Sequence, residues 1–147
     1  MIEITKMTTE HVAQIAELEK LCFSDPWSEA SVSSELDNPL SVWFVAVEDG
    51  TVLGYVGSQS VLDSADMMNI AVHPDHRRKG IAQKLIDKLC SALTEKGICH
   101  LMLEVRVSNA PAASLYEKLG FAVAGKRPGY YRNPREDALI LRKELAQ

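Results

Sequence analysis

The stretch HPDHRRKGIAQKLI, His73 to Ile86, decides how this sequence is interpreted. Three consecutive cations lead to Gly80, and the residues after it have the apolar spacing of a helix. The first turn of a helix leaves backbone N–H groups without partners, and the aligned peptide dipoles add roughly half a positive charge there. Because such a turn binds phosphate groups, the stretch predicts an anion site. A solvated basic turn before an ordinary helix is the alternative.

The glycine spacing excludes the two common nucleotide loops. A dinucleotide loop needs G-x-G-x-x-G and a Walker loop needs G-x-x-x-x-G-K-[ST], and this stretch has neither. Gly80 lets an anion approach the backbone closely, and Ala82 keeps the next turn uncluttered. Arg77, Arg78 and Lys79 add positive charge. The stretch therefore favours a phosphate-bearing ligand without nucleotide hydrolysis.

Composition narrows the class of protein. With 147 residues, 46% of them hydrophobic and 24% charged, the chain fits one domain over residues 1–147. A net charge of −4 argues against stable nucleic-acid binding. No segment approaches the ~18 apolar residues of a membrane span. Cys22, Cys90 and Cys99 match neither a disulfide framework nor a zinc site, so we expect reduced thiols, no metal and a cytoplasmic location.

Periodicity predicts an alternation of strands and helices without an internal repeat. The first helix should bury Val12, Ile15, Leu18 and Leu21, and Ser28 should cap a second, short helix. The strand, helix and strand around Gly80 should form a parallel crossover. The expected strands are 1–7, 41–48, 51–62, 67–72, 100–107, 121–125 and 137–145, and the longer helices are 8–21, 81–96 and 109–119. This order predicts an α/β domain with a mixed, mostly antiparallel central sheet flanked by helices.

The segment RRKGIA, with an arginine, two spacers, a glycine, one spacer and an alanine, resembles the pyrophosphate-binding signature of the GNAT superfamily of N-acetyltransferases. Within that superfamily the chain is most similar to bacterial enzymes that acetylate the N-terminal alanine of a small-subunit ribosomal protein. The similarity covers nearly the whole chain, in the segments DPWS, NIAV, LEVRVSN, YEKLGF, YY and EDALIL. One departure is Gly129, where those enzymes often have asparagine before the paired tyrosines.

The resemblance implies acetyl-CoA as the acyl donor, direct transfer in a ternary complex and a ribosomal protein N-terminus as the acceptor. Backbone N–H groups between Arg78 and Ala82 would hold the pyrophosphate, and the edge of the strand Ile70 to Val72 would pair with the pantetheine arm. That edge is available only if the sheet opens beside it. The residues implied in cofactor binding are Ile70, Ala71, Val72, Arg77, Arg78, Lys79, Gly80, Ile81, Ala82, Asn109 and Tyr116.

The resemblance gives catalytic roles to Glu104 and Tyr116. An α-amino group has a reference pKa of about 7.7–8.0, so a chain terminus needs only modest help from a base such as Glu104. Strand alternation places Glu104 on the same face as Arg106, and an ion pair between the two is the alternative. Tyr116, protonated at neutral pH, would donate to the departing thiolate. The alternatives are a core position for Tyr116 and a simple helix cap for Asn109.

Aromatic residues on expected loops are candidates for acceptor recognition. Trp27 lies in DPWS, where exposure is expected, and Tyr130 and Tyr131 lie in RPGYY. They either wall the acceptor slot or seal the edge of the sheet. An acetyltransferase for lysine or a small-molecule amine, and a non-catalytic acyl-CoA sensor, are the competing functions, and the oligomeric state is not determined by the sequence.

Overall fold

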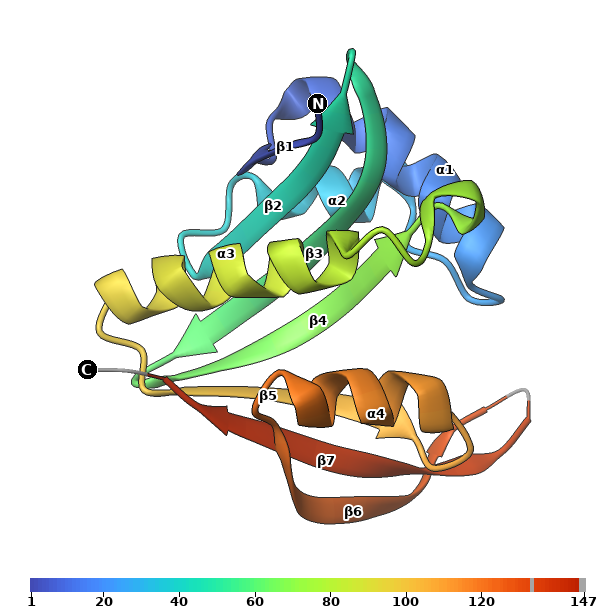
Figure 1. The fold of residues 1–147 in the computed structure, drawn as a ribbon, viewed down its shortest axis with the longest axis vertical. Helices are drawn as coiled ribbons and strands as arrows, with labels where there is room; N and C mark the ends of the chain where they lie inside the picture. The colour runs from blue at the N-terminus through green and yellow to red at the C-terminus, as the bar shows by residue number, and fades with distance from the viewer. Residues whose placement is uncertain (133, 146–147) are drawn as a thin grey trace.

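The strands form one sheet in the order β1-β2-β3-β4-β5-β7-β6 (Figure 1). The computed structural model describes residues 1–132 and 134–145. The strands in that part of the chain are β1 (Glu3–Lys6), β2 (Ser41–Glu48), β3 (Thr51–Val61), β4 (Ser64–Val72), β5 (His100–Arg106), β6 (Ala122–Tyr131) and β7 (Glu136–Glu144). The α-helices there are α1 (Val12–Cys22), α2 (Glu29–Glu35), α3 (Ile81–Glu95) and α4 (Ala110–Lys118). Among the described pairs β4 and β5 are parallel and the others antiparallel, which confirms the predicted mixed α/β sheet.

Helices cover both faces of the sheet. In Figure 1, α3 crosses β2, β3 and β4, and α4 lies over β5 and β7 on the same face. The core on this face joins Phe44, Val56 and Leu103 to α3 and to Tyr116 of α4. The second core, on the opposite face, joins Ile15 of α1 and Val32 of α2 to Trp43, Val45 and Tyr55 of the sheet.

The helix α3 connects β4 to β5 and makes the parallel crossover that the sequence predicts. Each of its core side chains is at most 2% exposed, and burying one contributes roughly 1.5–3 kcal/mol. These side chains are Ile81, Leu85, Ile86, Leu89 and Leu93. The helix is therefore anchored along its length, and its first turn has a fixed place at the end of β4.

The sheet opens between β4 and β5. Their pairing covers only Ser64–Asp66 with His100–Met102, although β4 continues to Val72 and β5 to Arg106. On the β3 side, Gly57 pairs with Asn69 and Ser58 with Met67, so Met68 is an extra residue in β4. Such a bulge bends its strand. Figure 1 shows the two strands diverging, and this divergence provides the opening on which the expected cofactor edge depends.

Two local expectations are wrong. Leu21 is 56% exposed, because the buried face of α1 includes Ala16 and Glu19 and ends before Leu21. Tyr130 and Tyr131 do not lie on a loop but at the end of β6, which runs well past the predicted end of that strand. The sequence signal for β6 is weak because most of this edge strand is exposed and has no apolar alternation.

The three cysteines are all partly buried free thiols. None of the described helices has the length and apolar character needed to cross a membrane.

Candidate active site

A groove of about 580 Å³ lies where β4 leaves β5, and both core faces contribute to it. This volume is in the range of small-molecule sites. Its walls come from the end of α1, the last residues of β4, the first turn of α3 and the exposed side of α4. The lining residues are Cys22, Phe23, Ile70, Ala71, Val72, His76, Arg77, Arg78, Gly80, Ile81, Ala82, Gln83, Pro111, Ala112, Leu115 and Tyr116.

The entry to α3 has the geometry of an anion site. Gly80 (φ 75°) and Arg78 (φ 67°) are both left-handed, and an added Cβ at Gly80 would meet no atom within 4 Å. The left-handed turn, and not crowding, therefore explains the glycine. The first intrahelical bond runs from Lys84 N–H to the Gly80 carbonyl, so the preceding N–H groups are left for another acceptor. Lys79 is absent from the groove wall and bonds His76 Nδ1 at 3.1 Å.

The outer edge of β4 faces this groove. His73 N–H donates to the Leu53 carbonyl of β3 at 2.7 Å, and strand alternation therefore turns the backbone groups of Ile70 and Val72 away from β3. Two polar side chains occupy this edge. Ile70 N–H donates to Asn69 Oδ1 at 3.1 Å, and Arg77 Nε donates to the Val72 carbonyl at 3.1 Å. Arg77 is thus attached to the strand edge as well as to the entry of α3.

Tyr116 belongs to both the core and the groove. It is 8% exposed, its ring packs against Phe121 at 5.6 Å between centroids, and it lines the groove. Burial and, to a smaller degree, the nearby Tyr131 raise the pKa of Tyr116 to about 12. Within the described residues no group accepts a hydrogen bond from its hydroxyl, which is therefore available to a ligand. Tyr116 thus occupies a core position and also lines the groove.

Glu104 lies on the other face of β5. Leu103 and Val105 point into the core beneath α4, so alternation turns Glu104 and Arg106 toward the opposite side. The ion pair between these two residues, which was the alternative to a catalytic role for Glu104, does not form. Glu104 Oε1 instead lies 3.7 Å from Arg127 Nε, while Arg106 pairs with Glu136 at 3.2 Å.

Glu104 has aromatic neighbours from β6. The Arg106 guanidinium lies 4.5 Å from the centre of the Tyr131 ring, and Arg127 lies 5.6 Å from that of Tyr130. We call Glu104, Arg106, Arg127, Tyr130 and Tyr131 the Glu104 cluster.

The Glu104 cluster and the groove are electrostatically connected through Tyr131. Burial raises the pKa of Tyr131 to about 12, with Tyr130 and Glu104 adding to the effect. Tyr131 in turn raises the pKa of Tyr116. Tyr116 from one face and Glu104 from the other therefore both lie near Tyr131, beside the opening between β4 and β5. A hydroxyl group and a carboxylate thus lie on opposite faces of the sheet, past the point where the pairing of β4 and β5 ends.

Six expected site residues lie outside the groove wall. Glu104, Tyr130 and Tyr131 belong to the Glu104 cluster, and the other three belong to neither group. Asn109 Oδ1 accepts from Ala112 N–H at 3.2 Å and caps α4. Trp27 is partly buried instead of exposed, because it packs edge-on against Trp43 at 5.5 Å. Lys79 is the third, bonded to His76 as described above.

The sequence does not predict that the end of α1 lines the groove, and it predicts only part of the wall that α4 provides. Cys22 and Phe23 end α1 and reach the groove across the opened sheet. Their sequence signal is only the end of a helical pattern, which does not reveal what the helix end will face. Leu115 of α4, which was not among the expected site residues, also lines the groove beside Tyr116.

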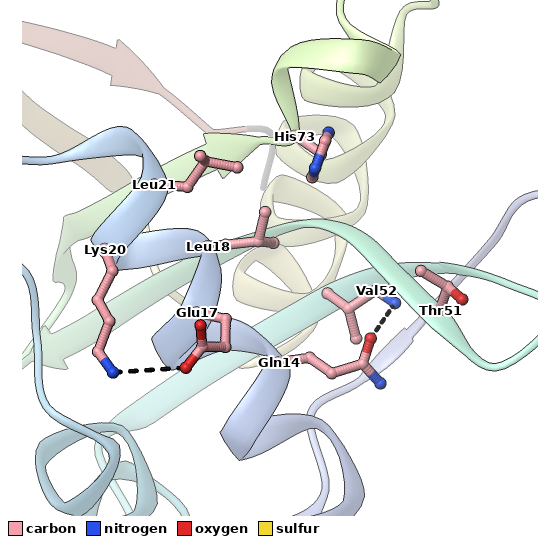
Figure 2. Close-up of a pocket in the computed structure, with 8 residues that line it drawn as sticks. All are labelled: Gln14, Glu17, Leu18, Lys20, Leu21, Thr51, Val52 and His73. Carbon is pink, nitrogen blue, oxygen red and sulfur yellow. Dashed lines mark hydrogen bonds and ion pairs between the residues drawn. The ribbon is translucent and has the colours of Figure 1, made fainter.

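A second hollow of about 500 Å³ lies between α1 and the start of β3, and Figure 2 shows its lining. Most of its polar side chains are already paired with one another or with the backbone. Gln14 accepts from Val52 N–H at 2.8 Å and donates to the Gly50 carbonyl at 3.1 Å, and Lys20 pairs with Glu17. The hollow therefore lacks the converging free polar groups of a reaction site. Among the described residues, no three His, Cys, Asp or Glu side chains are grouped to hold a metal ion.

The sequence has clear relatives. A model of the acetyltransferase (GNAT) family matches residues 12–121. The [ribosomal protein bS18]-alanine N-acetyltransferase of Escherichia coli K12 is 36% identical over 143 residues, which cover 96% of each chain. The enzyme of the same name from Haemophilus influenzae is 34% identical over 131 residues, covering 87% of this chain and 88% of its own.

Solved structures show the same fold. The ribosomal-protein-S18-alanine N-acetyltransferase from Escherichia coli superposes with a TM-score of 0.91 at 35% identity and covers 100% of this chain and 96% of its own. Arabidopsis thaliana NAA60, crystallised in complex with acetyl-CoA, superposes with a TM-score of 0.88 at 15% identity over 98% of both chains. At that identity the second likeness concerns the fold alone.

Proposed function

This chain belongs to the acetyltransferase (GNAT) family, and from that premise we propose that it acetylates the N-terminal alanine of ribosomal protein bS18. The family and the names of the relatives make it an acetyl-CoA-dependent protein N-acetyltransferase. The choice of acceptor is supported by relatives of that name that are aligned over nearly the full chain. The observation that carries the reaction is the opening between β4 and β5, which has a groove on one side and the Glu104 cluster on the other.

The groove fits acetyl-CoA, which supplies the acetyl group as a reactive thioester. The left-handed turn at Arg78 and Gly80, with the N–H groups of Ile81 and Ala82, would hold the pyrophosphate. The edge from Ile70 to Val72 would hold the pantetheine amides once the side chains now on it move aside. Arg77, which donates from Nε to the Val72 carbonyl and from Nη2 to Cys22 Sγ at 3.6 Å, would add positive charge, and Lys79 and Asn109 would act from outside the wall.

In our proposal, Glu104 removes a proton from the incoming α-amine, directly or through water. Its side chain is 22% exposed, so it remains reachable from the acceptor side, while Arg127 holds it in place. Tyr130 and Tyr131 would wall the slot beside it, and Trp27 would fix the α1–α2 segment across from them. Direct transfer without an acyl-enzyme is part of the same proposal, because a neutral amine is itself a sufficient nucleophile.

Tyr116 would stabilise the departing sulfur. With its pKa at about 12, the phenol is protonated at neutral pH. Full proton transfer to a thiolate, whose thiol has a reference pKa of ~8.5, would run uphill by about 3–4 pKa units. The hydroxyl therefore acts mainly as a hydrogen-bond donor while negative charge develops on the sulfur.

Mass spectrometry of peptides incubated with acetyl-CoA tests the proposal. The peptides begin with Ala-Arg, contain internal lysines, and carry either a free or a blocked N-terminus. We expect one acetyl group on the free α-amine and none on the blocked peptide. Acetylation of lysine in the blocked peptide would overturn the N-terminal assignment in favour of a lysine acetyltransferase. Acetyl-CoA binding without transfer to any peptide would instead favour a sensor.

A further inference from the structure

Glu19 is the most buried carboxylate of the described chain, and the mechanism above does not use it. It lies in α1 and is 1% exposed. Burial raises the pKa of its carboxyl group, and a hydrogen bond from Trp27 N–H works in the opposite direction. Leaving such a group buried is costly unless it is paired, so its partners show what it holds together.

Three donors from three segments converge on this carboxylate. Oε1 accepts from Trp27 N–H at 2.9 Å, and Oε2 accepts from Asn69 Nδ2 at 2.5 Å and from the Tyr55 hydroxyl. Two of these donors are amide nitrogen atoms, which cannot accept a hydrogen bond. Each of these two nitrogen atoms needs an oxygen that accepts its hydrogen bond. The two oxygen atoms of the Glu19 carboxylate meet this need as acceptors. We call Glu19, Tyr55, Asn69 and the Trp27 N–H the Glu19 tether.

The tether reaches the edge of the groove through Asn69. While its Nδ2 is held by Glu19, its Oδ1 accepts from Ile70 N–H at 3.1 Å. Only this orientation of the amide puts a donor against the carboxylate and an acceptor against the backbone. Asn69 also directly follows the extra residue Met68, where β4 bends away from β5. The carboxylate thus fixes the strand at the point where the sheet opens.

We propose that Glu19 is a positioning residue for acetyl transfer, which holds the β4 edge through Asn69 and the α1–α2 segment through Trp27 N–H. The inference rests on the proposed function, because it assigns these two segments to the cofactor and acceptor sides of one reaction. A shift of either segment would misplace the thioester relative to the amine. Such a shift lowers kcat even when acetyl-CoA and the peptide both still bind.

Glu35 offers a matched control. It is 7% exposed and accepts hydrogen bonds from Ser41 Oγ, Trp43 Nε1 and Gln59 Nε2 at 2.8–3.2 Å. None of these partners lines the groove. Glu35→Gln therefore disturbs a buried carboxylate with a similar set of bonds but should leave the geometry of transfer intact.

A compensating pair of substitutions separates positioning from stability. When Glu19→Gln is combined with Asn69→Asp, the new amide in α1 would donate to the new carboxylate in β4 and to the Tyr55 oxygen. The carbonyl of that amide would still accept from Trp27 N–H, and the new carboxylate would still accept from Ile70 N–H. Each pair of neighbours in the tether thus keeps a hydrogen bond, with donor and acceptor exchanged at the two contacts made by Oε2, and the Tyr55 hydroxyl proton is the one donor that loses its acceptor. In either single variant at least one pair of like groups faces each other.

The experiment measures kcat, KM for an Ala-Arg peptide and melting temperature for each full-length variant. Glu19→Gln should lower kcat by about 10- to 100-fold, with a loss in melting temperature similar to that of Glu35→Gln, whose kcat stays within about twofold of wild type. The double variant should recover kcat to within about threefold of wild type. Equal kcat values in Glu19→Gln and Glu35→Gln, or no recovery in the double variant, would overturn the inference.

Two further outcomes are covered. If Glu19→Gln and the double variant do not fold, Asn69→Ala decides, because it keeps Glu19 bonded to Trp27 N–H and Tyr55. A lowered kcat in Asn69→Ala supports the inference, and a wild-type kcat overturns it. If the wild-type enzyme leaves the peptide α-amine unmodified, the proposed function itself fails, which is distinct from an active enzyme that is indifferent to Glu19.

Discussion

The two sides of the opening in the sheet are built in different ways. The cofactor side consists mainly of one continuous segment, Ile70 to Ala82, supported by a helix whose apolar face is fully buried. The proposed acceptor side is assembled from the middle of β5 and the exposed strand β6. The first is a rigid backbone site, and the second is a set of side chains held by ion pairs and ring contacts.

This difference separates the two ligands energetically. Backbone N–H groups at a helix start recognise any phosphate in the right place, and few substitutions remove them. Side-chain contacts on exposed strands change with single substitutions. We therefore expect substitutions on the cofactor side to change KM for acetyl-CoA alone. Substitutions on the acceptor side should change KM for the peptide alone. Substitutions of Tyr116 and Glu104, which lie where the two sides meet, should lower the rate of acetyl transfer.

The largest effect should come from Tyr116→Phe. Removing the hydroxyl should lower kcat by about 100- to 1,000-fold with little change in the dissociation constant for CoA, because the ring still fills the groove wall. Steady-state kinetics and calorimetric titration with CoA measure the two quantities. In the wild-type enzyme the rate should not fall between about pH 9 and pH 10, because a phenol with a pKa of about 12 keeps its proton there. An alkaline limb in that interval would contradict the assignment to Tyr116.

Glu104→Gln should lower kcat/KM for the peptide by about 100-fold near neutral pH. The deficit should shrink as the pH rises past the α-amine pKa of ~8, since the substrate then arrives already neutral. A pH series with the wild type and the variant measures this convergence. A deficit that is the same at every pH would show that Glu104 does not act as a base toward the ammonium form.

Gly80→Ala tests the cofactor side with a small change. The left-handed φ of 75° strains any other residue, and we expect KM for acetyl-CoA to rise about fivefold while KM for the peptide stays constant. Gly97→Ala is the matched control, because Gly97 also has a left-handed φ (80°) and open space for a Cβ, in the turn after α3. It should lower the melting temperature by a similar amount without changing either KM. Equal KM values in both variants would show that the turn at Gly80 is not part of the cofactor site.

Tyr130→Ala tests the acceptor side. The ring is 48% exposed, so its removal should raise KM for the peptide about threefold, with the KM for acetyl-CoA unchanged. Arg127 would lose its ring contact but keep Glu104. A rise in the KM for acetyl-CoA instead would mean that the two sides are not separate.

The smallest effect should be that of Lys79→Ala. Its ammonium group bonds His76 and does not line the groove, so KM for acetyl-CoA should change by less than about twofold at physiological salt. Arg77→Ala is the useful comparison, because Arg77 lines the groove and bonds the β4 edge. If Lys79 proves to be the more important of the two, the anion lies further out than the groove indicates.

The sequence predicts the local structure of the proposed cofactor side well because its residues are contiguous. The start of the helix after Gly80 and the order of strands and helices along the chain follow from periodicity, and both are confirmed. The opening of the sheet does not follow from the sequence, because the bulge at Met68 is visible only when β3 is paired with β4. The family resemblance, and not the spacing of residues, supplies the roles of Glu104 and Tyr116.

The acceptor side is less predictable because its residues meet only in the folded chain. Strand alternation offered Arg106 as a possible partner of Glu104, but the actual partner is Arg127 on β6. Glu19 shows the same limit in α1. It lies four residues after Ile15, on the apolar face, and that position was the available sign of burial. The donors that make its burial tolerable come from residues up to 50 positions away in the sequence.

The early end of the β4–β5 pairing also bears on aggregation. An exposed strand edge is a template on which another polypeptide can add a strand, and proteins usually protect such edges with charges or bends. Here the edge from Ile70 to Val72 lies inside a groove, with the start of α3 and the side of α4 as its walls. These walls limit the space in which another polypeptide could pair with the edge. The enzyme thus keeps a sheet edge open to one kind of ligand while discouraging self-association through it.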